Sequence, residues 1–138
     1  MATYTLSEIK NNKSIADSWN PKIKEVYEAI TKNDPGMQIL ISEFKSLCHS
    51  LGVSEYDNYV STAGKSGLVV GFVYEVSGEN ATCIRIGLFI GYTITQDSYL
   101  ITYRVSERPS TSRYFQSVVE EHYFDAFKKA LIEWLEED

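Results

Sequence analysis

The sequence predicts a single α+β domain spanning residues 1–138, with an N-terminal helical hairpin, an antiparallel meander of three or four strands, and a long C-terminal amphipathic helix packed on the sheet. Three observations lead to this prediction. Apolar residues recur at helical spacing over 21–51, alternate at strand spacing over 68–105, and return to helical spacing over 112–137. A chain of 138 residues is the usual length of one domain.

The first helical signals lie near the N-terminus. Thr5 and Glu8 have the spacing of a capping box, and Asn11-Asn12 follows soon after, so any helix here is short. Asn20 followed by Pro21 then predicts the start of a helix over 21–33, because asparagine caps helices and proline fits their first position.

A second helix is expected over 36–51. Asp34-Pro35-Gly36 interrupts the first helix and offers a new start, and Gly52 stands where a helix end favours a left-handed residue. Two helices separated by so short a joint should form a hairpin.

The middle of the chain predicts strands. Residues 53–67 are polar and are expected to form a loop with a short strand at Glu55–Val60. Strands over 68–76, 82–93 and 98–105 follow, each with one apolar and one mixed face. A two-residue turn at Gln96-Asp97 would pair Tyr92 with Ile101, which brings the apolar faces of the last two strands together.

The last helix is expected over 112–137, about 39 Å long at 1.5 Å per residue. Its apolar stripe consists of Phe115, Val119, Tyr123, Phe127, Leu131 and Trp134. We therefore expect Trp134 in the core, whereas Trp19, in a polar segment, should lie near the surface.

The negative charge is concentrated in this last segment. The chain has a net charge of −6, and residues 114–138 carry seven acids and two bases, which leaves only −1 for the rest. Such a segment can simply aid solubility, or it can attract a basic protein. The candidate partner-binding residues are Glu120, Glu121, Asp125, Glu133, Glu136 and Glu137.

A second candidate site lies on the mixed face of the meander. Gly71, Gly87 and Gly91 fall on it, and glycine inside strands marks close approach by another group. That group is the protein's own helical hairpin, a small ligand or a partner protein. Four arginines lie on this face (Arg85 and Arg104) or just after it (Arg108 and Arg113), and they either bind an anionic ligand or pair with nearby acids. The candidate ligand-binding residues among them are Arg85, Arg104 and Arg108.

Other motifs are incomplete. Gly64-Lys65-Ser66 copies the end of a phosphate-binding loop, but Tyr59 replaces the required glycine and a strand follows instead of a helix. The two histidines, His49 and His122, and the two cysteines lack the spacing of a metal or nucleophile site, so we expect no metal and no cofactor. The acidic charge disfavours nucleic acid and anionic membranes, and the absence of a signal or membrane-spanning run predicts a cytoplasmic location.

The sequence thus favours a small acidic binding protein without enzymatic activity. It would neutralise a basic partner, as an immunity protein does against a nuclease-type toxin, or inhibit a nucleic-acid enzyme. The alternative is a small-ligand-binding or adaptor domain that uses the glycine-rich sheet face with Arg85 and Arg104.

Overall fold

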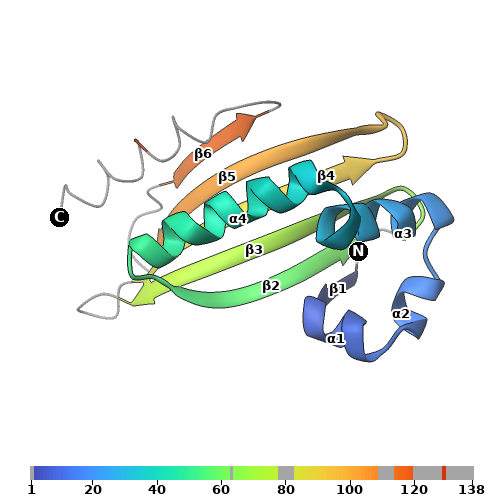
Figure 1. Cartoon of the computed structure of the whole chain (residues 1–138), viewed down its shortest axis with the longest axis horizontal. Coiled ribbons are helices and arrows are strands. Elements are labelled where there is room, and N and C mark those ends of the chain that lie inside the picture. Colours follow the sequence, from blue (N-terminus) through green and yellow to red (C-terminus); the bar gives the residue numbers. More distant parts are fainter. Residues whose placement is uncertain (1, 63, 78–82, 109–113, 120–128, 130–138) are drawn as a thin grey trace.

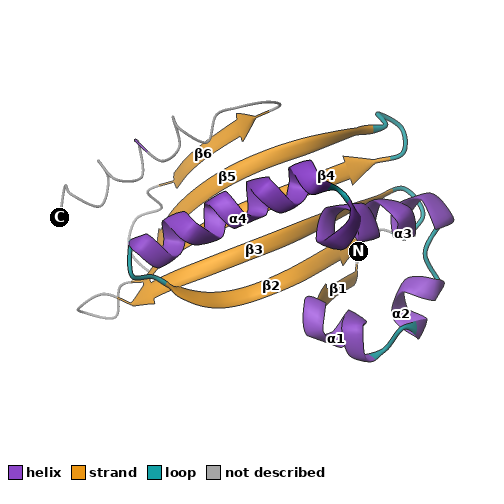
Figure 2. Ribbon diagram, viewed as in Figure 1, coloured by secondary structure: helices purple, strands orange, loops and turns teal. Residues whose placement is uncertain are grey.

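The computed structural model describes residues 2–62, 64–77, 83–108, 114–119 and 129. Its centre is one antiparallel sheet in which each strand pairs with the next along the chain (Figures 1 and 2). The six strands of this sheet are β1 (Ala2–Thr5), β2 (Ser54–Thr62), β3 (Gly67–Ser77), β4 (Cys83–Thr93), β5 (Ser98–Arg108) and β6 (Tyr114–Val119).

The described helices lie between β1 and β2, and the longest of them runs along one face of the sheet (Figure 1). They are α1 (Leu6–Asn11), α2 (Ser14–Asp17), α3 (Pro21–Glu28), the π-helical turn η1 (Ala29–Asn33) and α4 (Pro35–Ser50). We call the side of the sheet under α4 the first face and the opposite side the second face. Among the described helices, none has the length and apolar character needed to span a membrane.

The predicted helix starts are confirmed by their caps. The Thr5 hydroxyl accepts a hydrogen bond from the Glu8 amide at 3.1 Å, and the Thr5 amide donates to the Glu8 carboxylate at 3.3 Å, which completes the capping box. The Asn20 side chain accepts from the Lys22 amide at 2.8 Å, with Pro21 at the first position of α3.

The boundaries of α4 match the predicted helix over 36–51 to within one residue at each end. The Asp34 carboxylate accepts from the Gly36 amide at 2.9 Å, which ends η1 and starts α4. Gly52 follows α4 with a φ of +74°, a left-handed conformation that glycine adopts without strain.

The core fills the space between the helices and the first face. Phe44 of α4 is fully buried against two tyrosines of the sheet, with ring centroids 5.8 Å from Tyr74 and 6.3 Å from Tyr103. The sheet contributes alternate residues of its central strands, as expected when one face is buried: Leu68, Val70, Phe72, Tyr74, Ile86, Leu88, Ile90, Tyr92 and Tyr103.

The predicted position of Trp19 is wrong. Trp19 is only 7% exposed and belongs to the core, with its ring edge-on to Tyr27 at 5.5 Å. The Asn20 amide donates to the carbonyl of Gly64 at 2.7 Å, so this polar segment is held against the turn between β2 and β3. Tertiary packing has overridden the local polarity that suggested exposure.

The predicted three- or four-stranded meander is also wrong, because the sheet has six described strands. Ala2–Thr5 pairs with β2, and β2 runs the full length Ser54–Thr62 instead of the short strand expected at Glu55–Val60. Both strands are rich in polar residues, and β2 departs from regular pairing between Glu55 and Asp57. Polar strands with an irregularity give a weak alternation signal.

A helix over 112–137 is contradicted at its start, because Tyr114–Val119 forms strand β6 on the edge of β5. Phe115 and Val119 are four residues apart, a spacing that fits both a helical stripe and one face of a strand. The segment is rich in aromatic and β-branched residues, which favour strands. Residues 120–128 and 130–137 of the expected helix, including Trp134, lie outside the described residues.

The register between β4 and β5 differs from the prediction by two residues. Tyr92 pairs with Tyr99, not with Ile101, because the connecting turn spans Ile94–Asp97. Asp97 adopts a φ of +48°, its amide donates to the Thr93 carbonyl at 2.8 Å, and its carboxylate accepts from the Tyr92 hydroxyl at 2.5 Å. A shift of two residues keeps every side chain on its predicted face.

Candidate functional site

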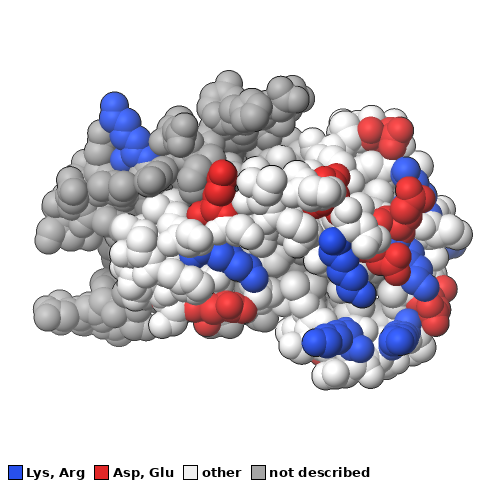
Figure 3. Space-filling model, in the orientation of Figure 1, with Lys and Arg blue, Asp and Glu red and all other residues white. Residues whose placement is uncertain are grey.

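The second face of the sheet is the candidate functional site, because α4 runs along the first face and the described core lies on that side (Figure 2). Figure 3 views the helical side, where described acids and bases are intermingled over the N-terminal helices. The second face is formed in its centre by Val69, Gly71, Val73 and Glu75 of β3, Arg85, Gly87, Phe89 and Gly91 of β4, and Leu100, Thr102 and Arg104 of β5.

Two of its glycines accommodate an aromatic ring from the sheet itself. A Cβ atom at Gly87 would lie 2.5 Å from Cε2 of Phe89, and one at Gly71 would lie 3.1 Å from Cε1 of the same ring. Tyr59 also limits the space at Gly71, because the same Cβ atom would lie 3.0 Å from Cζ of Tyr59, and the Tyr59 ring centroid lies 6.2 Å from that of Phe89. Of the explanations left open by the sequence, neither the helical hairpin nor an external partner is needed at these two positions.

The third glycine differs, because Gly91 has no ring beside it. A Cβ atom there would meet only ordinary contacts, 3.7 Å to the Leu100 carbonyl oxygen and 3.8 Å to Cγ2 of Val69. The space above Gly91 is part of a pocket of about 420 Å³, which we call the second-face pocket. Its size falls in the range of small-molecule sites.

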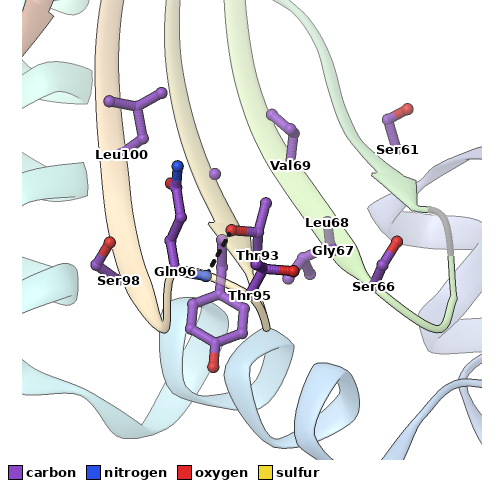
Figure 4. Close-up of a pocket in the computed structure, with 12 residues that line it drawn as sticks. Ser61, Ser66, Gly67, Leu68, Val69, Thr93, Thr95, Gln96, Ser98 and Leu100 are labelled. Carbon is purple, nitrogen blue, oxygen red and sulfur yellow. Dashed lines mark hydrogen bonds between the residues drawn. The ribbon is translucent and has the colours of Figure 1, made fainter.

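Two turns and the adjoining parts of strands β2, β3, β4 and β5 line this pocket (Figure 4). Gln96 extends from the β4–β5 turn alongside Leu100, and Ser66 lies across from it on the β2–β3 turn. Val69 and Gly91 form the floor between them. The pocket therefore has an apolar middle and hydroxyl or amide groups at both sides: Ser61 and Ser66 on one side, Thr95, Gln96 and Ser98 on the other.

Hydrogen bonds hold the two turns in place. The Thr62 hydroxyl, which is buried, donates to the Gly67 carbonyl at 3.1 Å and accepts from the Gly64 amide at 2.7 Å. The Ile94 amide donates to the Ser66 carbonyl at 2.9 Å, which joins the β2–β3 turn to the β4–β5 turn. The two turns are thus held by the Thr62 side chain and by one backbone hydrogen bond before any ligand arrives.

The pocket is uncharged. Of the described residues that line it, none is acidic or basic. Asp97 belongs to the adjacent turn, but its carboxylate is engaged by the Tyr92 hydroxyl. Leu100, at 47% exposure, is one of the two large hydrophobic residues that the described surface leaves most open, and it lies on this wall. An apolar contact with a ligand here would remove that surface from water.

The predicted arginine site is only partly assembled. The Arg85 guanidinium donates through Nε to the Glu75 carboxylate at 3.1 Å, with both side chains mostly buried. Arg104 is exposed and lies opposite Gly87, a diagonal neighbour of Arg85, while Arg108 pairs in register with Cys83. Of the two roles that the sequence left open for the arginines, Arg85 therefore has the second, which is pairing with a nearby acid.

The histidine, cysteine and acidic candidates do not contribute to the second-face pocket among the described residues. His49 is exposed, with its ring 5.8 Å from that of Tyr74, and burial raises the pKa of the neighbouring Cys48 thiol to about 12. No cluster of three or more metal-ligating side chains occurs among the described residues. The acidic candidates Glu120, Glu121, Asp125, Glu133, Glu136 and Glu137, together with His122, lie outside the described residues.

Sequence reasoning missed the lining residues of the second-face pocket. The cross-strand neighbours of each glycine could have located the pocket in the sequence. Gly71 and Gly87 both flank Phe89, whereas Gly91 is paired with Val69 and Leu100. The predicted β4–β5 register would have placed Thr102 opposite Gly91. The error of two residues therefore concealed the difference between the glycines.

Comparison with protein-family models, with curated proteins and with solved structures finds no significant match to this chain.

Proposed function

We propose that this protein is a small-ligand-binding domain and that the second-face pocket is its binding site. The observation that carries the proposal is the contrast between the glycines, because Phe89 fills the space at Gly71 and Gly87, whereas the space at Gly91 stays open. The role is binding without catalysis. A serine or threonine hydroxyl becomes a nucleophile through an adjacent base, and none of the described lining residues supplies a carboxylate or imidazole.

A preformed site lowers the cost of binding, because a ligand need not order the loops that surround it. The bond between Ile94 and Ser66 and the bonds of Thr62 give the pocket this property. Ligand binding in this pocket does not require Arg85 or Arg104, which the sequence had suggested as ligand-binding residues. Arg104 is four residues from Leu100 along β5, about 13 Å at the usual rise per residue, and Arg85 is held by Glu75.

The experiment is to fill the pocket without unfolding the protein. Gly91→Val places a branched side chain above the pocket floor, where a Cβ atom has only ordinary contacts. Thr102→Val is the matched control, an isosteric change on the same face outside the pocket lining. Small uncharged compounds are screened by chemical-shift perturbation of backbone amides in all three proteins.

Compounds that shift the amides around Gly91, Leu100 and Ser66 should bind the wild type and Thr102→Val alike, and Gly91→Val at least tenfold more weakly. Equal binding to wild type and Gly91→Val would refute the pocket as the site. Thermal unfolding of each variant, measured without ligand, separates occlusion of the pocket from loss of the fold.

We also propose a second function, favoured by the charge distribution: binding of a basic cytoplasmic protein by the acidic C-terminal segment. Residues 114–138 carry seven acids against two bases, while the rest of the chain is nearly balanced. A concentrated negative field raises the association rate with a basic partner. Immunity to a nuclease-type toxin or inhibition of a nucleic-acid enzyme are functions of this kind.

Charge reversal tests this second function. A partner captured from the native host is first identified, and its association rate is then measured with Glu133, Glu136 and Glu137 changed together to Lys, at two salt concentrations. Slower association with a flatter salt dependence is expected. An unchanged rate would contradict the proposal. Gly91→Val serves as the control that separates this surface from the pocket.

A further inference from the structure

We infer that the ligand of the second-face pocket is an uncharged, elongated molecule with an apolar middle and hydrogen-bonding groups at both ends. The inference rests on the function proposed for the pocket and specifies its ligand class. It follows from three features of the lining: the absence of charged side chains among the described lining residues, the apolar floor, and polar groups on opposite walls.

The charge of the ligand follows from what it would meet. An ion that enters a site without a counter-charge loses part of its hydration, and no opposite charge compensates for that loss. The described lining offers hydroxyl, amide and aliphatic groups only. Lys65 precedes Ser66 in the turn but is exposed, and Asp97 is bonded to Tyr92. The pocket therefore offers a carboxylate, phosphate or ammonium group too little interaction energy to offset the hydration that the group loses.

The shape follows from the positions of the walls. Val69, Gly91 and Leu100 belong to three adjacent strands and form a continuous apolar strip. Ser61 on β2 stands at one end, and Ser98 and Gln96 stand at the β5 end. Strand spacing places β2 and β5 on the order of 14 Å apart. A molecule that uses both polar walls must extend across the strip.

Gln96 is the lining residue that favours a neutral polar group at one end of the ligand. Its side chain extends along the pocket wall, and the Gln96 amide nitrogen of the backbone donates to the Thr93 hydroxyl at 3.4 Å, which positions the turn (Figure 4). A glutamine amide both donates and accepts hydrogen bonds, so it matches a neutral polar group such as an amide or alcohol. A glutamate there would only accept, and would bring a charge.

Three probes with the same ring test the part of the inference that concerns charge: phenylacetamide, which is neutral, phenylacetate, an anion, and phenethylamine, a cation. Each is titrated into wild-type protein, and the amide shifts of Gly91, Leu100 and Ser66 are followed. Phenylacetamide should saturate these shifts with a Kd on the order of 1 mM, as expected for so small a compound. Both charged probes should bind at least tenfold more weakly.

The variant Gln96→Glu should reverse part of this order, weakening phenylacetate further and strengthening phenethylamine several-fold. Asn12→Asp adds the same charge on an exposed residue outside the pocket lining and serves as the control. If phenylacetate or phenethylamine binds the wild-type pocket as tightly as phenylacetamide, the ligand class is wrong while the pocket stands as a binding site. If no probe shifts these amides up to its solubility limit, the proposed function itself fails.

Discussion

Phe89 shows how one side chain can shape a sheet face. Its ring covers Gly87 and approaches Gly71, so the two glycines are explained by a neighbour within the sheet. Aromatic cover of strand glycines stabilises positions that lack a side chain of their own. Gly91 receives no such cover, and the second-face pocket exists because of this difference between otherwise similar residues.

Alanine substitutions should distinguish a glycine that the Phe89 ring covers from one that faces the open pocket. Gly87→Ala places a Cβ atom 2.5 Å from the Phe89 ring, so the ring must move, and we expect a loss of about 1–3 kcal/mol in the free energy of unfolding. Gly91→Ala meets no close atom and should change that free energy by less than about 0.5 kcal/mol, or raise it slightly. Urea denaturation of both variants checks this, and equal losses would contradict the described packing of Phe89.

Three tyrosines predict how stability depends on alkaline pH. The pKa values of Tyr74, Tyr92 and Tyr103 are raised from 10.0 to about 12, by burial first for Tyr74 and Tyr103 and by the hydrogen bond to Asp97 first for Tyr92. Because these folded-state pKa values lie above the unfolded value, folding favours the protonated phenols. Their contribution to stability is complete below pH 10 and is lost as pH rises toward 12.

Denaturation midpoints measured from pH 8 to 11.5, with tyrosinate absorbance followed in parallel, test this expectation. Stability should fall above pH 10, and ionisation of the buried tyrosines should coincide with unfolding. Tyr92→Phe should reduce the steepness of the fall, since it removes the phenol that bonds Asp97. A slope that none of the single Tyr→Phe variants alters would show that other groups control it.

At the scale of elements, the start of α4 depends on one cap. The Asp34 carboxylate accepts hydrogen bonds from the amides of Gly36 and Met37 at 2.9 and 3.3 Å. Asp34→Ala should therefore lower the free energy of unfolding by about 1 kcal/mol. Asp17→Ala, which removes an exposed ion pair with Lys24, is the comparison and should cost less. The reverse order in urea denaturation would contradict the cap.

Strand β6 is the element that most changes the predicted fold. Secondary chemical shifts of the Cα and Cβ atoms should be extended for Tyr114–Val119, and their amides that bond β5 should exchange slowly. Helical shifts over this range would restore the sequence-based prediction of a helix from residue 112.

The helices were largely predictable because their signals are local. Asn20-Pro21 and Asp34-Pro35 mark starts, Gly52 marks an end, and the apolar stripe between them has an unambiguous period. The extra strands were not predictable in this way. β1 and β2 are polar, and Phe115 with Val119 in β6 fits both periods, so only pairing with neighbours decides their conformation.

At the scale of the whole molecule, the face of each strand residue was predictable while the partners across strands were not. Alternation fixes which side a residue faces, and an error of two residues leaves it unchanged. The pocket depends on the cross-strand register, because that register pairs Gly91 with Leu100 and places the turn Ile94–Asp97 beside them. The left-handed Asp97 and its bond to Tyr92 set both.

Intermolecular nuclear Overhauser effects between the ring protons of phenylacetamide and the methyl groups of the protein test most directly whether the second-face pocket binds a small uncharged ligand. Leu100 and Ile39 are the large hydrophobic side chains that the described surface exposes most, and they lie on β5 and α4 respectively. We expect contacts to the methyl groups of Leu100 and Val69, which line the pocket. Contacts to Ile39 with none to Leu100 would contradict this expectation.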